Sequence, residues 1–196
     1  FGTPENARAT LIAGQLARRY GLPYSASNAS ASNIVDAQAA YESEMSIWSA
    51  VLGGAHLIYH GAGWMEGGLT ASFEKLVLDV EMLQAMAITI APVDVSDREL
   101  SEGLQALAGV PAGGHFFGSP HTLARYETAF YRPVLSDWQT HESWEAAGGR
   151  TATERATDVW QSALESYQRP PLDHAVREAL ERFVARRKVE LRNADI

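Results

Sequence analysis

The chain has 196 residues and an apolar fraction of 46%, which is typical of a folded domain with a filled core rather than of a disordered segment. Its 24 acidic residues outnumber its 16 basic ones, and the net charge of −8 argues against nucleic acid or an anionic membrane as a partner. Cysteine is absent, which excludes disulfides, thiolate metal ligands and cysteine nucleophiles.

The sequence shows neither a membrane segment nor a signal peptide. Its apolar runs are far shorter than the roughly 20 residues that a membrane span needs. The opening residues 1–4 lead directly into a predicted helix. We therefore expect a cytoplasmic protein. Because the chain opens without Met, we also expect either a processed N-terminus or the C-terminal part of a longer protein.

Residues 1–93 alternate between predicted helices and predicted strands. In chain order these are a helix from Thr3-Pro4 to Gly21, a strand over 22–27, a helix capped by Asp36, a strand over 55–60 and a helix opened by Ser72. Strands that alternate with helices pair in parallel, because the helix returns the chain to the starting edge. The strand over 55–60 is apolar at successive positions, which predicts burial on both faces.

The loops that leave the two strands form the predicted functional face. In parallel α/β folds, ligands bind at the carboxyl ends of the strands, whether the sheet is open or closed into a barrel. The polar loop 28–33 and the glycine-rich stretch 61–68 both lie at that end. Because two parallel strands are too few for a stable sheet, we expect further strands from upstream residues or from another chain.

Residues 94–196 are predicted to be mainly helical. The predicted helix starts are Ser96 and Thr151, each followed three residues later by Glu in a capping box, then Ser119-Pro120, and Asp173 after the break at Pro170-Pro171. Residues 131–149 are predicted to be irregular. We therefore expect this region to be a helical extension of the α/β half.

Several long stretches of the chain carry a recognisable pattern. They are FGTPENA, QLARRYGLPY, DAQAAYES, GGAHLIYHGAGWMEGGLTASFEKLVLDVEMLQ, GGHFFGSPHTL and YRPVLSDW. Together they resemble the C-terminal part of the trimethylamine methyltransferase family, whose members are corrinoid-dependent methyltransferases with a TIM-barrel fold. The resemblance implies an α/β chain in which residues 1–93 are the last βα units of a TIM (β/α)8 barrel. It implies that residues 94–196 are a helical C-terminal extension packed on that barrel.

The resemblance also implies a reaction, in which a methyl group moves from a methylated amine to the cobalt of a corrinoid carried on a partner protein. A neutral amine leaves more readily than an amide anion, so the methylated nitrogen should be cationic. Some family members use pyrrolysine for this activation, whereas this sequence contains only standard residues. A quaternary amine such as glycine betaine is therefore the expected substrate, ahead of trimethylamine. We expect no metal bound by the chain itself, and a homo-oligomer that covers unpaired sheet edges.

Trp64, Tyr59 and Tyr24 are the aromatic candidates for binding the substrate. A quaternary ammonium ion donates no hydrogen bond, so aromatic faces are its natural partners, each worth about 0.5–2 kcal/mol. All three residues lie in or just after the predicted strands. Packing between the barrel and its helices is the alternative explanation for each of them.

His60 and Glu66 are the predicted catalytic residues, because they follow the second strand where barrel enzymes place their chemistry. Either side chain would orient a carboxylate tail or handle a proton. The alternatives are a structural histidine at the barrel rim and, for Glu66, an interaction with the N-terminus of the helix opened by Ser72.

Ser27 and Asn28, together with Ser25, are predicted to hydrogen-bond a substrate carboxylate, although the polarity of a loop alone would account for them.

Gly61, Gly63 and His115 are the predicted corrinoid-binding residues. Glycines let a flat corrin face approach the backbone, while a tight turn explains them equally well. The stretch lacks the Lys of a phosphate-binding loop. His115 and His121 flank a loop that we expect to fold over the barrel mouth.

Two other functions stay open at this level. One is a quaternary-amine-binding module without methyl transfer. The other is a TIM-barrel metal-dependent hydrolase that uses His60, His115 and His121, although the metal-binding spacing H-E-x-x-H does not occur.

Overall fold

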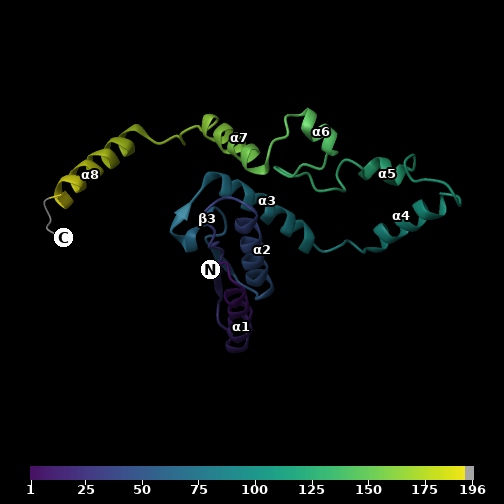
Figure 1. Cartoon of the computed structure of the whole chain (residues 1–196), viewed down its shortest axis with the longest axis horizontal. Helices are drawn as coiled ribbons and strands as arrows, with labels where there is room; N and C mark the ends of the chain where they lie inside the picture. Colours follow the sequence, from purple (N-terminus) through teal and green to yellow (C-terminus); the bar gives the residue numbers. More distant parts are fainter. Residues whose placement is uncertain (193–196) are drawn as a thin grey trace. The chain divides into compact units, whose positions relative to one another are not determined.

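The computed structural model describes residues 1–192. The described chain divides into two compact units, one over residues 1–161 and one that begins at Ser162. The first unit contains α1 (Pro4–Tyr20), β1 (Ser25–Ser27), α2 (Ala37–Leu52), β2 (Leu57–Tyr59), β3 (Trp64–Met65), the 3-10 helix η1 (Glu66–Gly68), β4 (Thr70–Ala71), α3 (Phe73–Ile90), α4 (Asp97–Ala108), α5 (Pro120–Arg125) and α6 (His141–Ala146) (Figure 1). Helix α7 (Ala152–Glu165) runs into the second unit, which also holds α8 (His174–Arg192).

The helix boundaries predicted for the first half are confirmed. The side chains of Thr3, Asp36 and Ser72 each accept a hydrogen bond from a backbone N–H group in the first turn of α1, α2 and α3. Gly21 ends α1 in the left-handed region, with a φ of 66°. These ends were predictable because each depends on one local residue type.

The helix starts predicted for the second half are confirmed as well. Thr151 Oγ1 accepts a hydrogen bond from Glu154 N at 3.3 Å, and the Glu154 carboxylate accepts one from Thr151 N at 2.7 Å, which completes a capping box. Asp173 accepts hydrogen bonds from the first turn of α8. The prediction that residues 131–149 are irregular is wrong over α6, where Thr140 caps a short helix.

The two predicted strands pair in parallel, with a register that runs from Ser25 opposite Leu57 to Ser27 opposite Tyr59. Both strands are shorter than predicted. The prediction that the second strand is buried on both faces is wrong, since Leu57 and Tyr59 are 52% and 56% exposed. Within residues 1–192 this sheet contains only β1 and β2, so each strand has one edge without a strand partner.

The glycine-rich stretch after β2 is a small hairpin rather than a plain turn. Strands β3 and β4 pair antiparallel, with Trp64 opposite Ala71 and Met65 opposite Thr70, and η1 forms the bend. Met65 is 5% exposed and anchors the hairpin in the core. The sequence pattern missed this hairpin because each strand has only two residues.

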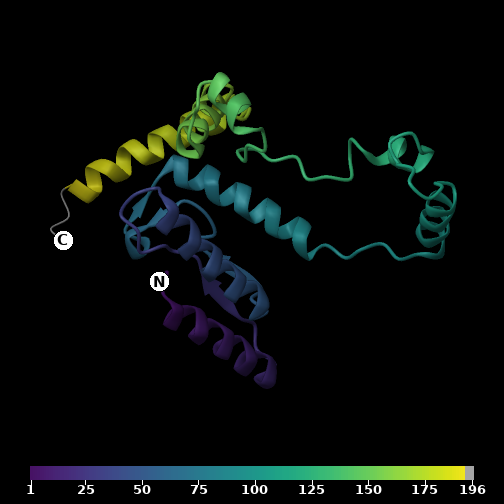
Figure 2. The same cartoon turned by 45° about the vertical axis from the view of Figure 1, so that its right-hand side comes forward.

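Helix α2 lies between α1 and α3 (Figures 1 and 2). The contact between α1 and α2 depends on glycine, because a Cβ at Gly14 would lie 2.7 Å from the carbonyl carbon of Gly53. The buried residues of α2 include Ile47 and Ala50 but also several serines. This core is therefore built partly from small and polar side chains.

Helix α3 buries a different face from the one that its apolar residues predict. Phe73 and Leu76 are 54% and 41% exposed, whereas Lys75 and Asp79 are 1% and 2% exposed. The apolar residues at helical spacing predicted a buried face made of Phe73, Leu76, Val77, Val80, Leu83 and Ala87, and of these only Val77 is buried. The buried charges face α2 and the hairpin, as described below.

Two carboxylates of α3 hold the segments that follow it. Glu81 accepts hydrogen bonds from the backbone N–H groups of Val134 at 2.7 Å and Leu135 at 3.2 Å. Glu74 accepts one from the indole N–H of Trp160 at 2.7 Å. Val77 packs in a small apolar cluster with Leu135 and Ala156.

Across residues 1–192, no helix combines the length and the apolar character needed to cross a membrane.

Candidate functional site

The carboxyl ends of β1 and β2 bring three of the predicted site residues together. Ser27 Oγ lies 2.9 Å from His60 Nδ1, at hydrogen-bonding distance. The rings of His60 and Trp64 meet edge to face, with centroids 5.1 Å apart and planes at 79°. The parallel register explains this grouping, because Ser27 lies opposite Tyr59 and His60 follows directly.

The two predicted tyrosines border the same rim. Tyr59 is exposed, and its ring centroid lies 6.4 Å from that of His60. The Tyr24 hydroxyl donates a hydrogen bond to the carbonyl of Thr10 in α1 at 2.8 Å. Both tyrosines, with Ser27 and His60, line a cavity of about 500 Å³ bounded by α1 and β1. Ser27 and His60 thus belong both to this cavity and to the group that contains Trp64.

His60 and Glu66 share an unusual backbone conformation. Among the non-glycine residues that the structure describes, these two have a left-handed φ, at 53° and 51°. Such conformations are uncommon and cluster at functional positions. The Glu66 carboxylate accepts a hydrogen bond from Thr70 Oγ1 at 2.9 Å, so it is engaged within the hairpin. His60 instead faces Ser27 at the ends of the parallel strands.

Asn28 and the two predicted glycines hold the loop between His60 and Trp64. Asn28 is 1% exposed, and its Nδ2 donates a hydrogen bond to the Gly61 carbonyl at 3.1 Å. Within residues 1–192, no group donates a hydrogen bond to Asn28 Oδ1. Gly63 is buried and donates its N–H to Asp79 Oδ2 at 2.8 Å.

Gly61 and Gly63 differ in the space around them. A Cβ at Gly61 would meet only the Ile58 carbonyl oxygen, at 3.7 Å. A Cβ at Gly63 would lie 3.3 Å from the Cβ of Leu76, and the φ of Gly63 is +88°. Gly61 therefore leaves open backbone surface, whereas Gly63 faces α3.

The structure does not bring His115 to the strand ends. His115 lines a separate cavity of about 420 Å³ whose lining residues all fall within 105–120. Its ring lies 5.3 Å from that of Phe117. His121 lines a third cavity with Glu102 and Arg125. In the part of the chain that the structure describes, no three His, Asp or Glu side chains are grouped closely enough to hold a metal ion.

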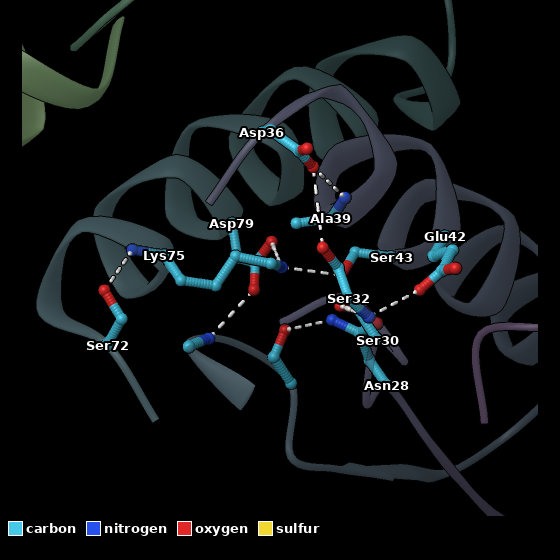
Figure 3. A network of polar contacts seen from close by, with 12 residues as sticks. Asn28, Ser30, Ser32, Asp36, Ala39, Glu42, Ser43, Ser72, Lys75 and Asp79 are labelled. Carbon is cyan, nitrogen blue, oxygen red and sulfur yellow. Dashed lines mark hydrogen bonds and ion pairs between the residues drawn. The ribbon is translucent and has the colours of Figure 1, made fainter. Parts of the chain in front are cut away.

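A buried ion pair of α3 lies next to the loop between His60 and Trp64, and the sequence pattern did not predict it. Lys75 Nζ pairs with Asp79 Oδ1 and donates a hydrogen bond to Ser43 Oγ of α2 at 2.6 Å (Figure 3). Burial lowers the pKa of Lys75 and raises the pKa of Asp79, while the attraction between the two groups opposes both shifts. The available signal was two opposite charges four residues apart in a mostly apolar helix.

The loop that leaves β1 is also held by a buried carboxylate. Glu42, which is 6% exposed, accepts hydrogen bonds from the N–H groups of Ala31 at 2.6 Å and Ser32 at 3.1 Å. Ser30 and Ser32 are almost fully buried. The predicted polar loop 28–33 is thus hydrogen-bonded to α2 and partly internal, with residues 28–30 and 32 buried (Figure 3).

Comparisons with known proteins cover nearly the whole chain. The family model described as trimethylamine methyltransferase (MTTB) matches residues 1–192. A glycine betaine methyltransferase from Desulfitobacterium hafniense (strain Y51) is 32% identical over 97% of this chain and 40% of its own length. The trimethylamine methyltransferase MttB of another strain of that species, DSM 10664 / DCB-2, is 32% identical over 93% of this chain and 36% of its own length.

An archaeal relative shows the same relationship. The trimethylamine methyltransferase MttB2 of Methanosarcina mazei is 32% identical over 88% of this chain and 34% of its own length. The chain therefore spans 34–40% of the length of these three relatives.

Proposed function

This chain belongs to the trimethylamine methyltransferase family, and from that premise we propose that it forms the C-terminal part of a methyltransferase acting on a methylated amine. The methyl group passes to the cobalt of a corrinoid held by a partner protein. The observation that carries the proposal is the meeting of Ser27, His60 and Trp64 at the ends of two parallel strands. Strand ends are where parallel α/β enzymes bind their ligands.

We propose that β1 and β2 are strands of a TIM barrel, with residues 94–196 as its helical extension. The parallel β1–α2–β2 unit supports this assignment. The exposed faces of Leu57 and Tyr59 support it as well, because further strands and their side chains would cover them.

The proposed substrate is a quaternary amine with a carboxylate, as in glycine betaine. Trp64 and Tyr59 supply aromatic faces for the methylated cation on either side of His60 in sequence. When the Ser27 hydroxyl donates its hydrogen to His60 Nδ1, the Nε2–H of the imidazole is free to donate to a carboxylate oxygen. Trimethylamine lacks that carboxylate, so the hydrogen bond from His60 favours glycine betaine over trimethylamine.

The methyl acceptor fits the open side of the loop at Gly61. When bound, the reduced corrinoid supplies the electron pair for the new bond to the methyl carbon, and the C–N electron pair leaves with the amine. Gly61, at which a side chain would meet almost nothing, leaves room for a flat ring. Gly63 faces α3 and His115 lines a separate cavity, so we do not include these two residues in the proposed corrinoid contact.

Methyl transfer to free cob(I)alamin, followed by its absorbance change, tests the proposed function. We expect the full-length protein to methylate cob(I)alamin with glycine betaine faster than with trimethylamine. His60→Gln should narrow the difference between the two amines, because the carboxylate loses its donor. Absence of transfer with both amines would contradict the enzyme, and calorimetric binding of glycine betaine without transfer would favour a binding module.

A further inference from the structure

We propose that Lys75 and Asp79 are positioning residues of the candidate site, because their buried pair holds the backbone of Gly63 and thereby the spacing between His60 and Trp64. The inference deepens the proposed function and relies on it for one of its readouts. Both side chains are almost fully buried, so they act through the loop rather than on a substrate.

The loop between His60 and Trp64 is held at both ends by a hydrogen bond. On one side, Asn28 Nδ2 donates to the carbonyl of Gly61 at 3.1 Å. On the other, Asp79 Oδ2 accepts the N–H of Gly63 at 2.8 Å. Only Ala62 separates these two anchored glycines. Backbone hydrogen bonds add to these anchors, from Ser72 N to the Gly63 carbonyl at 3.0 Å and from Ser30 N to the Trp64 carbonyl at 3.4 Å. The side chains that hold the loop are thus one residue after β1 and one residue of α3.

The stability of the fold alone does not explain why this buried pair is charged. A buried ion pair contributes little net stability compared with apolar side chains of similar volume, because desolvation offsets the attraction. A carboxylate accepts a backbone hydrogen bond more strongly than a neutral group does. Lys75 compensates the Asp79 charge, and Ser43 of α2 accepts a further hydrogen from Lys75. The arrangement thus links α2, α3 and the loop at a defined distance.

Glu81 of the same helix provides a matched control. It is also a buried carboxylate that accepts backbone hydrogen bonds, but its donors are Val134, Leu135 and Ser136. Its loss should lower the stability of the protein without moving the loop between His60 and Trp64.

Two double variants of the full-length protein separate the Gly63 contact from the buried charge. Lys75→Met with Asp79→Asn keeps an oxygen that accepts the Gly63 N–H, whereas Lys75→Met with Asp79→Leu keeps none. Both remove the charges together, so neither leaves an unpaired ion in the core. Glu81→Gln is the control for general destabilisation.

Amide hydrogen exchange over residues 61–64 and calorimetric binding of glycine betaine are the readouts. We expect the Leu-containing variant to exchange Gly63 about tenfold faster and to bind glycine betaine about tenfold more weakly than the Asn-containing one. The Glu81→Gln variant should match the wild type in both. Equal exchange in the two double variants would overturn the inference, as would faster exchange with unchanged binding.

The two readouts also distinguish a failure of this inference from a failure of the proposed function. If the wild type binds no glycine betaine, the proposed substrate is wrong, and the exchange of Gly63 alone decides whether Asp79 fixes the loop. A tenfold difference in exchange would then still support a positioning role for the pair. Equal exchange would remove that role as well.

Discussion

Residues 1–90 and residues 91–192 are stabilised in different ways. All buried polar and charged side chains within residues 1–192 lie in the first region, and they include Lys75, Asp79 and Glu42. The second region contributes two buried apolar residues, Leu135 and Ala156, and both belong to the cluster around Val77 of α3. The first region therefore has an internal polar core, whereas residues 134–160 of the second region contact α3.

This difference indicates in which region the exact positions of buried side chains matter most for the candidate site. A buried polar group is tolerated only when its partner sits at the right distance and angle, so a polar core specifies geometry as well as stability. In the first region those partners hold the loops at the candidate site. In the second region α4 and α5 contact each other through Arg125 and two glutamates, and leave many leucines exposed. Substitutions in the two regions should therefore have unequal consequences.

Replacing Lys75 alone by Met should cause the largest loss of stability. Asp79 would remain buried without its partner, which costs about 3–5 kcal/mol of unfolding free energy. Urea denaturation measures the loss. The double variant with Asp79→Leu is the control, and it should recover most of the lost stability. A loss below about 1 kcal/mol for the single variant would show that the pair is not effectively buried.

Glycine-to-alanine substitutions should have opposite signs in the two regions. Gly14→Ala would place a methyl group against the backbone of Gly53, and we expect a loss of about 1–3 kcal/mol. Gly103→Ala in α4 meets nothing within 4 Å, and we expect a gain of about 0.5–1 kcal/mol. Thermal or urea unfolding compares them, and equal effects would contradict the close contact between α1 and α2.

Removing the Glu81 charge should change the response of stability to acid. Burial alone would raise the pKa of Glu81, but hydrogen bonds from Ser136, Val134 and Leu135 outweigh it, and the pKa lies below its ordinary value. The resulting stabilisation is present above the ordinary glutamate pKa of about 4.3. It is lost as the pH falls through the lower pKa of the folded protein.

Glu81→Gln should therefore cost about 1–3 kcal/mol near neutral pH and flatten the fall of stability below about pH 4. Denaturation series at several pH values measure both effects. An unchanged slope would mean that other carboxylates govern the acid sensitivity.

Trp64→Ala should weaken binding of glycine betaine by about 1–2 kcal/mol, because one aromatic face is lost from the cation site. Trp138 is exposed in the second region and offers the matched control. Trp138→Ala should leave the affinity unchanged in the same calorimetric titration. Equal affinities for wild type and the Trp64 variant would remove Trp64 from the site.

The smallest effect is expected in the exposed apolar face of α4. Leu104 is 67% exposed, so Leu104→Gln should change stability by less than about 0.5 kcal/mol. A larger loss would reveal that this face is covered in solution. The measurement is urea unfolding at two protein concentrations.

Local chemistry made part of the fold and site predictable. Thr3, Asp36 and Ser72 cap their helices as predicted because capping depends on one side chain and the next turn of backbone. The parallel pairing of the strands followed from the alternation of helices and strands, whereas the contact between Ser27 and His60 depends on a register that this pattern does not specify. The hairpin of β3 and β4 was missed because two-residue strands leave no periodic pattern.

The sequence alone determined the order of the first three helices and of the two parallel strands, and the residues that cap the helices, since these depend on neighbours along the chain. Only the tertiary structure decided which side chains of α3 are buried, and that Asn28 and Asp79 hold Gly61 and Gly63. Lys75 looks like a solvated charge until the partner from α2 is known. The reason is that burial of a charge depends on compensation by groups distant in sequence, and no local pattern records that compensation.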